Sequence, residues 1–172
     1  MVSKLIIIRG NSGSGKSTIA KAVRERINEK TALVEQDYLR RSVLGVTGKS
    51  GDDIIMLIDQ VVRFSLDRGY VTILEGILPK EYYGEMLLRL VNYADKSYVF
   101  YLDIPIEETL VRHQTKPNSH EFGETEIRDW FRDKDYLGIE NEVIIDSSST
   151  IQNSVETTLS NLGVPTIKSR AC

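Results

Sequence analysis

Short apolar runs alternate along this chain with segments whose apolar residues recur every three or four positions. A continuous apolar run favours a strand that is buried on both faces, and the recurrence favours a helix with one apolar side. We therefore expect strands at residues 4–9, 31–36, 68–76, 96–104 and 141–146. The segments between them predict helices, at residues 19–27, 54–65, 79–92, from 105 onward, at 124–135 and after 149.

This alternation of strand and helix predicts an α/β fold in which helices cover both faces of a parallel sheet. The chain has 172 residues, of which 41% are hydrophobic, and this is enough for one compact domain with a proper core. The sequence shows no internal repeat, low-complexity tract or linker. We therefore expect a single domain over residues 1–172.

The composition of the chain limits which partners it could bind and in which cellular compartment it is expected. The formal net charge is −3, so no overall basic field favours a long nucleic acid as substrate. The single cysteine, Cys172, excludes a disulfide framework within the monomer and suits a reducing cytosol. The first apolar run is too short for a signal peptide, and no run approaches the length of a membrane span. We expect a soluble cytoplasmic protein with no membrane partner.

The sharpest motif follows the first strand, in the stretch RGNSGSGKST. It fits G-x-x-x-x-G-K-[ST] at every fixed position, between an apolar strand and an amphipathic helix. Backbone N–H groups of such a loop bind a phosphate chain together with the N-terminus of the next helix. The lysine reaches the β- and γ-phosphates, and the serine hydroxyl is a ligand for Mg²⁺. The expected nucleotide-binding residues are Gly10, Asn11, Ser12, Gly13, Ser14, Gly15, Lys16, Ser17 and Thr18.

An aspartate, Asp37, comes just after the second predicted strand. Ligands of an open α/β sheet bind beyond the carboxyl ends of its strands, so Asp37 could accept the proton of an attacking hydroxyl there. The alternative is that it caps the helix that follows. Arg40 or Arg41 could face the substrate or its phosphate, and the other would be a surface charge.

A second acid, Glu75, ends the apolar run VTILEG. An acid at the end of a buried strand beside a phosphate loop could hold Mg²⁺ or one of its waters. Most sites of this kind use aspartate, and Asp103 at the end of YVFYLD is the rival. We favour Ser17 and Glu75 as the metal-binding pair.

A group of basic residues follows the fourth predicted strand and includes Arg112, Arg128 and Arg132. Arg128 and Arg132 are four residues apart and should share a helix face, where like charges are unfavourable unless an anion lies between them. A segment that carries arginines could neutralise charge on a transferred phosphoryl group. The alternative is ordinary ion pairing, since Glu124 lies four residues before Arg128.

The phosphate loop, the aspartate after the second strand, the acid that ends the third strand and the stretch YLDIPIEETLVRH before a basic segment resemble small P-loop kinases. Relatives of this kind are chloramphenicol phosphotransferase, the zeta toxins, gluconate kinase, the polynucleotide 5′-hydroxyl kinase domain and, more distantly, adenylate kinase. The stretch RHQTKPNSHEFGETEIRDWFRDKD also resembles the lid of bacterial proteins labelled as uridine kinases.

The resemblance implies a three-layer α/β/α fold with a five-stranded parallel sheet in the order 2-3-1-4-5 and a small helical lid at about residues 114–135. It implies that Asp37 is the general base, and that Arg112, Arg128 or Arg132 act from the lid. The substrate would lie between residues 38–53, the loop 76–83 and the lid. Tyr82 and Tyr83 could form walls of that site or pack in the core.

These features predict an ATP- and Mg²⁺-dependent kinase that phosphorylates a hydroxyl of a small molecule, such as a nucleoside, a sugar or an antibiotic-like compound. One alternative is a kinase for nucleic-acid 5′-hydroxyl ends or for a nucleotide sugar. An alternative of another class is an ATP-binding switch with slow hydrolysis. The guanine-reading stretch N-K-x-D that is usual in GTPase switches does not occur in the sequence.

Overall fold

Five parallel strands form the centre of the computed structural model, which describes residues 2–46, 51–114 and 123–165. Their order is β2-β3-β1-β4-β5, so the predicted sheet order is confirmed. The phosphate-loop strand therefore lies in the middle, between β3 and β4. The strands are β1 (Lys4–Gly10), β2 (Thr31–Glu35), β3 (Val71–Gly76), β4 (Lys96–Asp103) and β5 (Glu142–Asp146).

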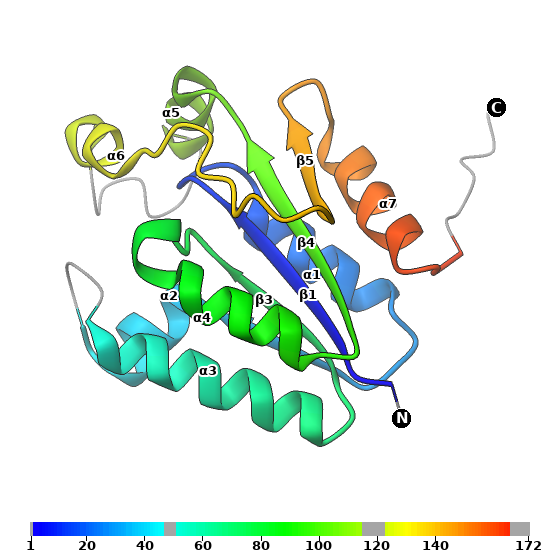
Figure 1. Ribbon diagram of the computed structural model, residues 1–172. Helices are drawn as coiled ribbons and strands as arrows, with labels where there is room; N and C mark the ends of the chain where they lie inside the picture. The colour runs from blue at the N-terminus through cyan, green and yellow to red at the C-terminus, as the bar shows by residue number, and fades with distance from the viewer. Residues whose placement is uncertain (1, 47–50, 115–122, 166–172) are drawn as a thin grey trace, which may run out of the picture.

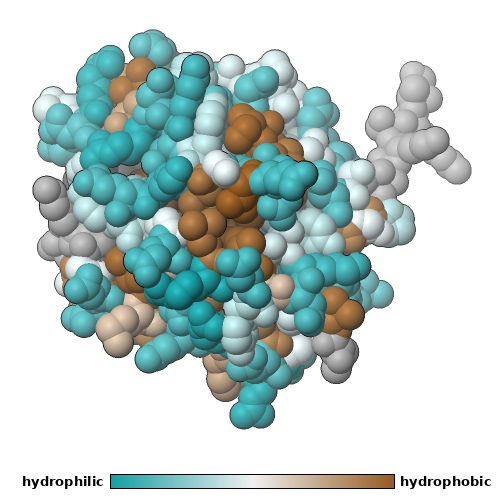
Figure 2. Space-filling model, viewed as in Figure 1, coloured by the Kyte–Doolittle hydropathy of each residue, from teal (hydrophilic) through white to brown (hydrophobic). Residues whose placement is uncertain are grey.

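Helices cover both faces of this sheet, which gives the predicted three-layer α/β/α arrangement. Figure 1 shows α3 (Asp52–Asp67) and α4 (Lys80–Tyr93) on one face and α1 (Lys16–Arg26) and α7 (Ile151–Asn161) on the other. Each face has its own core cluster of buried side chains. The apolar sides of α3 and α4 pack on the sheet. The face of the molecule seen in Figure 2 is mixed, with hydrophilic residues around a hydrophobic area near its middle. No helix in the described part of the chain is long and apolar enough to span a membrane.

Short elements extend the carboxyl edge of the sheet. β2 runs directly into α2 (Gln36–Tyr38) and then into a π-helical turn, η1 (Leu39–Val43). On the other side of the phosphate loop, β4 is followed by α5 (Ile106–Gln114) and α6 (Glu124–Trp130). Residues 115–122 of the predicted lid lie outside the described residues, as do residues 47–50 of the predicted substrate region at 38–53.

The predicted helix over residues 124–135 is too long. It ends at Trp130, and Phe131 has an extended backbone with φ −63° and ψ 132°. The expectation that Arg128 and Arg132 share a helix face is therefore wrong. The physical reason is tertiary, since the backbone of Arg132 is hydrogen-bonded to the side chain of Asn11, 121 residues earlier in the chain.

Candidate active site

The phosphate loop connects β1 to α1 at the carboxyl edge of the sheet. Gly13 has φ +82°, and a Cβ atom there would come within 2.7 Å of the Thr109 backbone oxygen. A Cβ atom at Gly10, where φ is +145°, would come within 2.8 Å of the Leu102 oxygen. Both positions therefore need glycine for conformation and for space. α1 begins at Lys16, so its N-terminal N–H groups lie at the end of the loop, as in an anion site.

The side chain of Lys16 folds back over this loop. Its Nζ donates a hydrogen bond to the Asn11 backbone oxygen at 2.7 Å and lies 3.5 Å from Ser14 Oγ. The residue is 7% exposed. The ammonium group is therefore held by carbonyl and hydroxyl oxygens of the phosphate loop itself.

Ser17 and Glu75 form a hydrogen-bonded pair. Ser17 lies in the first turn of α1 and Glu75 near the end of β3, and Ser17 Oγ donates a hydrogen bond to Glu75 Oε1 at 2.9 Å. Glu75 is buried, and its burial raises the pKa of its carboxyl group, although the charge of Lys16 and the Ser17 hydrogen bond oppose this shift. The rival, Asp103, instead accepts a 2.5 Å hydrogen bond from the Tyr136 hydroxyl. A hydroxyl and a carboxylate are hard oxygen donors of the kind that Mg²⁺ prefers.

An open cleft of about 400 Å³ lies beside this pair, on the β2 side of the loop. It brings together four residues that the sequence had singled out, namely Ser17, Asp37, Arg41 and Glu75. Two further lining residues, Tyr38 and Ser42, belong to the region 38–53 that was expected beside the substrate, whereas Lys21 and Glu35 were missed by the sequence analysis. The position of Lys21 one helical turn after Ser17 was the signal that could have indicated it.

Asp37 lies at the start of α2 with two arginines on the same carboxylate oxygen. Arg40 Nη2 donates to Asp37 Oδ1 at 2.8 Å, and Arg41 Nε donates to the same atom at 2.9 Å. Partial burial would raise the pKa of Asp37, but the hydrogen bonds and charges of the two arginines outweigh it and hold the pKa below its ordinary value. The carboxylate is therefore ionised at neutral pH.

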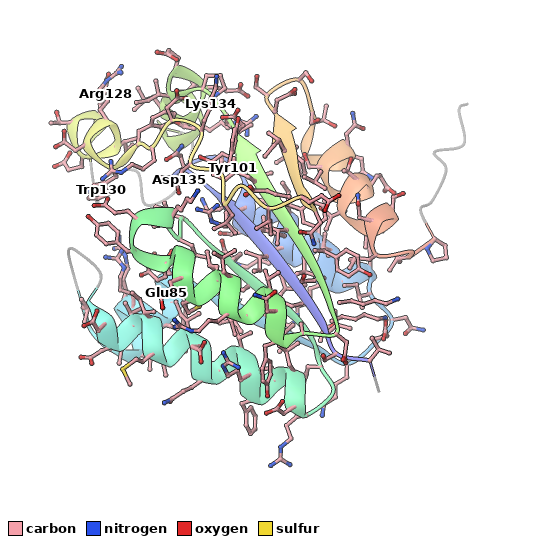
Figure 3. All side chains as sticks on the ribbon, viewed as in Figure 1. Glu85, Tyr101, Arg128, Trp130, Lys134 and Asp135 are labelled. Atoms are coloured by element: carbon pink, nitrogen blue, oxygen red, sulfur yellow. The ribbon has the colours of Figure 1, made fainter. Side chains whose placement is uncertain are left out.

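The three lid arginines have different surroundings. Arg112 Nη1 on α5 donates to the Ser14 backbone oxygen at 3.0 Å and so contacts the phosphate loop. Arg128 Nε donates to Glu124 Oε1 at 2.8 Å, and its side chain points away from the sheet in Figure 3. The Arg132 guanidinium group donates to the backbone oxygens of Asp129 and Phe131.

The two candidate wall tyrosines also differ. Tyr83 is fully buried in the core, and its hydroxyl accepts a 2.9 Å hydrogen bond from Gln36 Nε2. Core packing is therefore the alternative that is observed for Tyr83. The Tyr82 side chain is at the surface, with the residue 43% exposed.

Sequence reasoning missed a buried polar group next to the phosphate loop. Arg9, at the end of β1, is fully buried and contacts Asp135, whereas Tyr101 on β4 contacts both Asp135 and Arg132. A charged residue at the end of the apolar run KLIIIRG was a signal for Arg9, because a buried charge needs partners. No local signal identified Asp135 as the partner.

A phosphate loop in the middle of a parallel sheet of this order, with a carboxylate at the end of the neighbouring strand, defines a P-loop kinase fold. Residues 2–117 match the family model for adenylylsulphate kinase. This match covers more than half of the chain, so the chain belongs to the adenylylsulphate kinase family. The protein is an ATP-dependent kinase, which confirms that prediction.

Several solved structures have folds similar to that of this chain. The APS kinase of Mycobacterium tuberculosis, in complex with AMPPNP and APS, has a TM-score of 0.72 at 19% identity and covers 95% of this chain and 97% of its own. A gluconokinase from Sinorhizobium meliloti has a TM-score of 0.68 at 18% identity, with coverages of 94% and 92%. A tunicamycin resistance protein from Deinococcus radiodurans has a TM-score of 0.67 at 17% identity, and the match covers 95% of this chain and 97% of that protein. A search of curated proteins gave no significant match.

Proposed function

We propose that the protein transfers the γ-phosphoryl group of ATP to a hydroxyl of a small, uncharged, polyhydroxylated molecule that binds in the Asp37 cleft. The observation that carries this proposal is that Asp37 and the Ser17–Glu75 pair line one cleft beside the phosphate loop. This arrangement supports a proton acceptor and a Mg²⁺ site on the same side of the loop that we expect to bind the phosphates.

Each group has a distinct role in this proposal. Asp37, ionised at neutral pH, orients the acceptor hydroxyl and takes its proton as the oxygen attacks the γ-phosphorus. Lys16 would stabilise the negative charge on the β- and γ-phosphates. Arg112 contacts the loop and also pairs with Glu108, and it would contribute a guanidinium donor beside the phosphates. Ser17 and Glu75 would hold Mg²⁺ directly or through a water, and the bound ion would neutralise charge on the phosphate oxygens.

The charges in the cleft favour an uncharged acceptor. Both cations that line it face carboxylates, because Arg41 pairs with Asp37 at 2.9 Å and Lys21 with Glu35 at 3.4 Å. A third carboxylate, Glu75, lies deeper in the cleft. A strongly anionic acceptor would therefore meet positive charge that is already compensated, whereas carboxylate and hydroxyl oxygens suit the hydroxyl groups of a sugar, nucleoside or antibiotic-like compound.

A second candidate acceptor is adenylylsulphate, since the chain belongs to the family that carries this name. The two candidate acceptors differ in charge, so a phosphorylation experiment that offers both kinds of compound separates them. We would incubate the protein with Mg²⁺ and ATP and a panel of nucleosides, sugars, sugar acids, aminoglycosides, chloramphenicol-like drugs, adenylylsulphate and 5′-hydroxyl oligonucleotides. Mass spectrometry would then detect compounds that gain one phosphate.

The expected result is phosphate gain on an uncharged polyhydroxylated compound. Selective labelling of adenylylsulphate would contradict the acceptor class but retain the kinase mechanism. Labelled oligonucleotides would favour a nucleic-acid kinase. Slow ATP loss that no member of the panel accelerates would favour a nucleotide-dependent switch instead.

Glu75→Gln is expected to separate metal binding from stability. Glutamine keeps an acceptor oxygen for Ser17 but removes the charge that makes Glu75 a metal partner, so the Mg²⁺ concentration for half-maximal activity should rise roughly 10- to 100-fold. Because burial raises the pKa of Glu75, the ionised form destabilises the fold at neutral pH. The variant should therefore have the higher melting temperature at pH 7.5, measured without Mg²⁺.

The sign of this stability effect can be checked by titration. Wild-type Glu75 becomes neutral as the pH falls through its raised pKa, so the advantage of the variant should shrink toward acidic pH. Glu35→Gln is the matched control, because Glu35 is paired in register with Glu75 on the neighbouring strand and lines the same cleft. Its Mg²⁺ requirement should stay at the wild-type value. An unchanged Mg²⁺ requirement in Glu75→Gln would remove Glu75 from the metal site.

A further inference from the structure

The chain between α6 and β5 crosses the carboxyl end of the sheet beside the phosphate loop. We call residues 131–137 of it the return segment. Figure 1 shows this segment passing from α6 across the ends of β1 and β4 toward the start of β5. Three buried side chains from β1, the phosphate loop and β4 hold it there through hydrogen bonds to its backbone. The side chain from β1, Arg9, also pairs with the Asp135 side chain.

Asn11 makes a paired contact with the backbone of Arg132. Asn11 Nδ2 donates to the Arg132 oxygen at 2.7 Å, and the Arg132 N–H donates to Asn11 Oδ1 at 2.9 Å. Only one orientation of the amide can make both bonds, since the backbone group offers one donor and one acceptor. Asn11 is 5% exposed, so water cannot readily replace either bond.

Arg9 and Asp135 make the second contact. Arg9 Nη2 donates to Asp135 Oδ2 at 2.7 Å, and Arg9 Nη1 donates to the Asp135 backbone oxygen at 2.9 Å. The same Oδ2 atom accepts the N–H of Lys80, the first residue of α4, at 2.9 Å. The end of β1, the return segment and the start of α4 are therefore joined through one carboxylate.

The Tyr101 hydroxyl group lies between these two contacts. It donates to the Arg132 oxygen at 3.3 Å and accepts from the Asp135 N–H at 3.3 Å. Burial raises the pKa of Tyr101 to about 12, so the hydroxyl keeps its proton at physiological pH and remains a donor. Figure 3 shows Tyr101 and Asp135 together at the end of the sheet.

We propose that Asn11 is a positioning residue that couples phosphate binding in the loop to the placement of the return segment and of α6. Asn11 contacts both the phosphate loop and the return segment. Its backbone oxygen accepts the hydrogen bond of Lys16 Nζ, and its side chain is hydrogen-bonded to the backbone of Arg132. Bound phosphate competes for the Lys16 ammonium group, which changes the bonding of the Asn11 peptide group. The proposal rests on the nucleotide binding of the proposed function.

The coupling has a built-in reporter. Trp130 is the single tryptophan of the chain, and it ends α6 two residues before the anchored Arg132. Inorganic tripolyphosphate with Mg²⁺ is the suitable probe, because it can occupy the phosphate loop without adenine contacts elsewhere. Isothermal titration calorimetry would measure its binding, and the emission and acrylamide quenching of Trp130 would measure the response of α6.

We expect tripolyphosphate to change the fluorescence of Trp130 in the wild-type protein. Asn11→Ala keeps the loop backbone and Lys16, and calorimetry sets the tripolyphosphate concentration that saturates it whatever its affinity. At saturation it should lose most of this fluorescence change. Tyr101→Phe keeps the ring and removes the hydroxyl between the two contacts, so it should show an intermediate response. Asn92→Ala, which removes an exposed amide on α4, should respond like the wild type.

The outcomes separate this inference from the proposed function. If the wild type does not bind tripolyphosphate or ATP, nucleotide binding itself is contradicted. If it binds but Trp130 does not respond, or if Asn11→Ala responds fully, the coupling through Asn11 is overturned. If circular dichroism shows that Asn11→Ala does not fold, Tyr101→Phe decides the question, and a full wild-type response in that variant overturns the proposal.

Discussion

Lys16→Met is expected to lower kcat about 1,000-fold. The Lys16 ammonium group is buried against the phosphate loop, so it can meet the transferred phosphoryl group in a region from which bulk water is largely excluded. Charge that develops on phosphate oxygens is stabilised more strongly there than in water. Steady-state turnover with the acceptor identified by the panel would measure this loss.

The matched control is Lys96→Met, which removes the same charge from the amino end of β4, at the edge of the sheet opposite the loop. It should keep wild-type turnover. ATP affinity should be measured for both variants, because a loss in binding alone would raise KM rather than lower kcat. A Lys16→Met protein that folds, binds ATP and turns over normally would contradict the role of the phosphate loop in phosphoryl transfer.

Asp37→Asn is expected to lower kcat about 100- to 10,000-fold with little change in ATP affinity. Asparagine has nearly the shape of aspartate and can still accept hydrogen bonds from Arg40 and Arg41, but it cannot take the proton of the acceptor hydroxyl. The Asp37 side chain is 66% exposed, and ion pairs of this kind contribute little to stability. The melting temperature should therefore change little.

Asp59→Asn is the matched control for Asp37→Asn. Asp59 pairs with Arg63 at 2.7 Å on α3, so this variant weakens a similar ion pair away from the cleft. Its turnover should match that of the wild type. If Asp37→Asn also kept full turnover, Asp37 would have no part in the proton transfer. The helix-capping alternative would not explain its position either, because Glu35 is the N-cap of α2 and the Asp37 carboxylate binds Arg40 and Arg41 instead.

Much of the fold follows from local patterns in the sequence. The five strands lie close to the predicted apolar runs, because a strand buried on both faces needs a continuous apolar stretch. The start of β3 shows the limit of this reasoning. The strand begins at Val71 rather than at residue 68, since Arg68 and Gly69 form the turn that ends α3.

The lid shows a second limit. The apolar pattern of residues 124–135 is compatible with a helix throughout, yet α6 ends at Trp130. Helix propensity is a weak preference that tertiary contacts can override. Here Asn11 takes the backbone donor and acceptor of Arg132, and no spacing within the segment itself indicates a partner 121 residues away.

The sequence by itself determined the phosphate loop, the alternation of strand and helix, and the acids at the ends of the second and third strands, because each depends on neighbours within a few residues. Only the tertiary structure decided that Ser17 meets Glu75 rather than Asp103, and that Asp37 shares their cleft. It also decided that Arg9, Asn11 and Tyr101 hold the return segment. These contacts depend on the strand order, in which β1 lies between β3 and β4. A parallel sheet brings the carboxyl ends of its neighbouring strands together, whatever their separation in the chain.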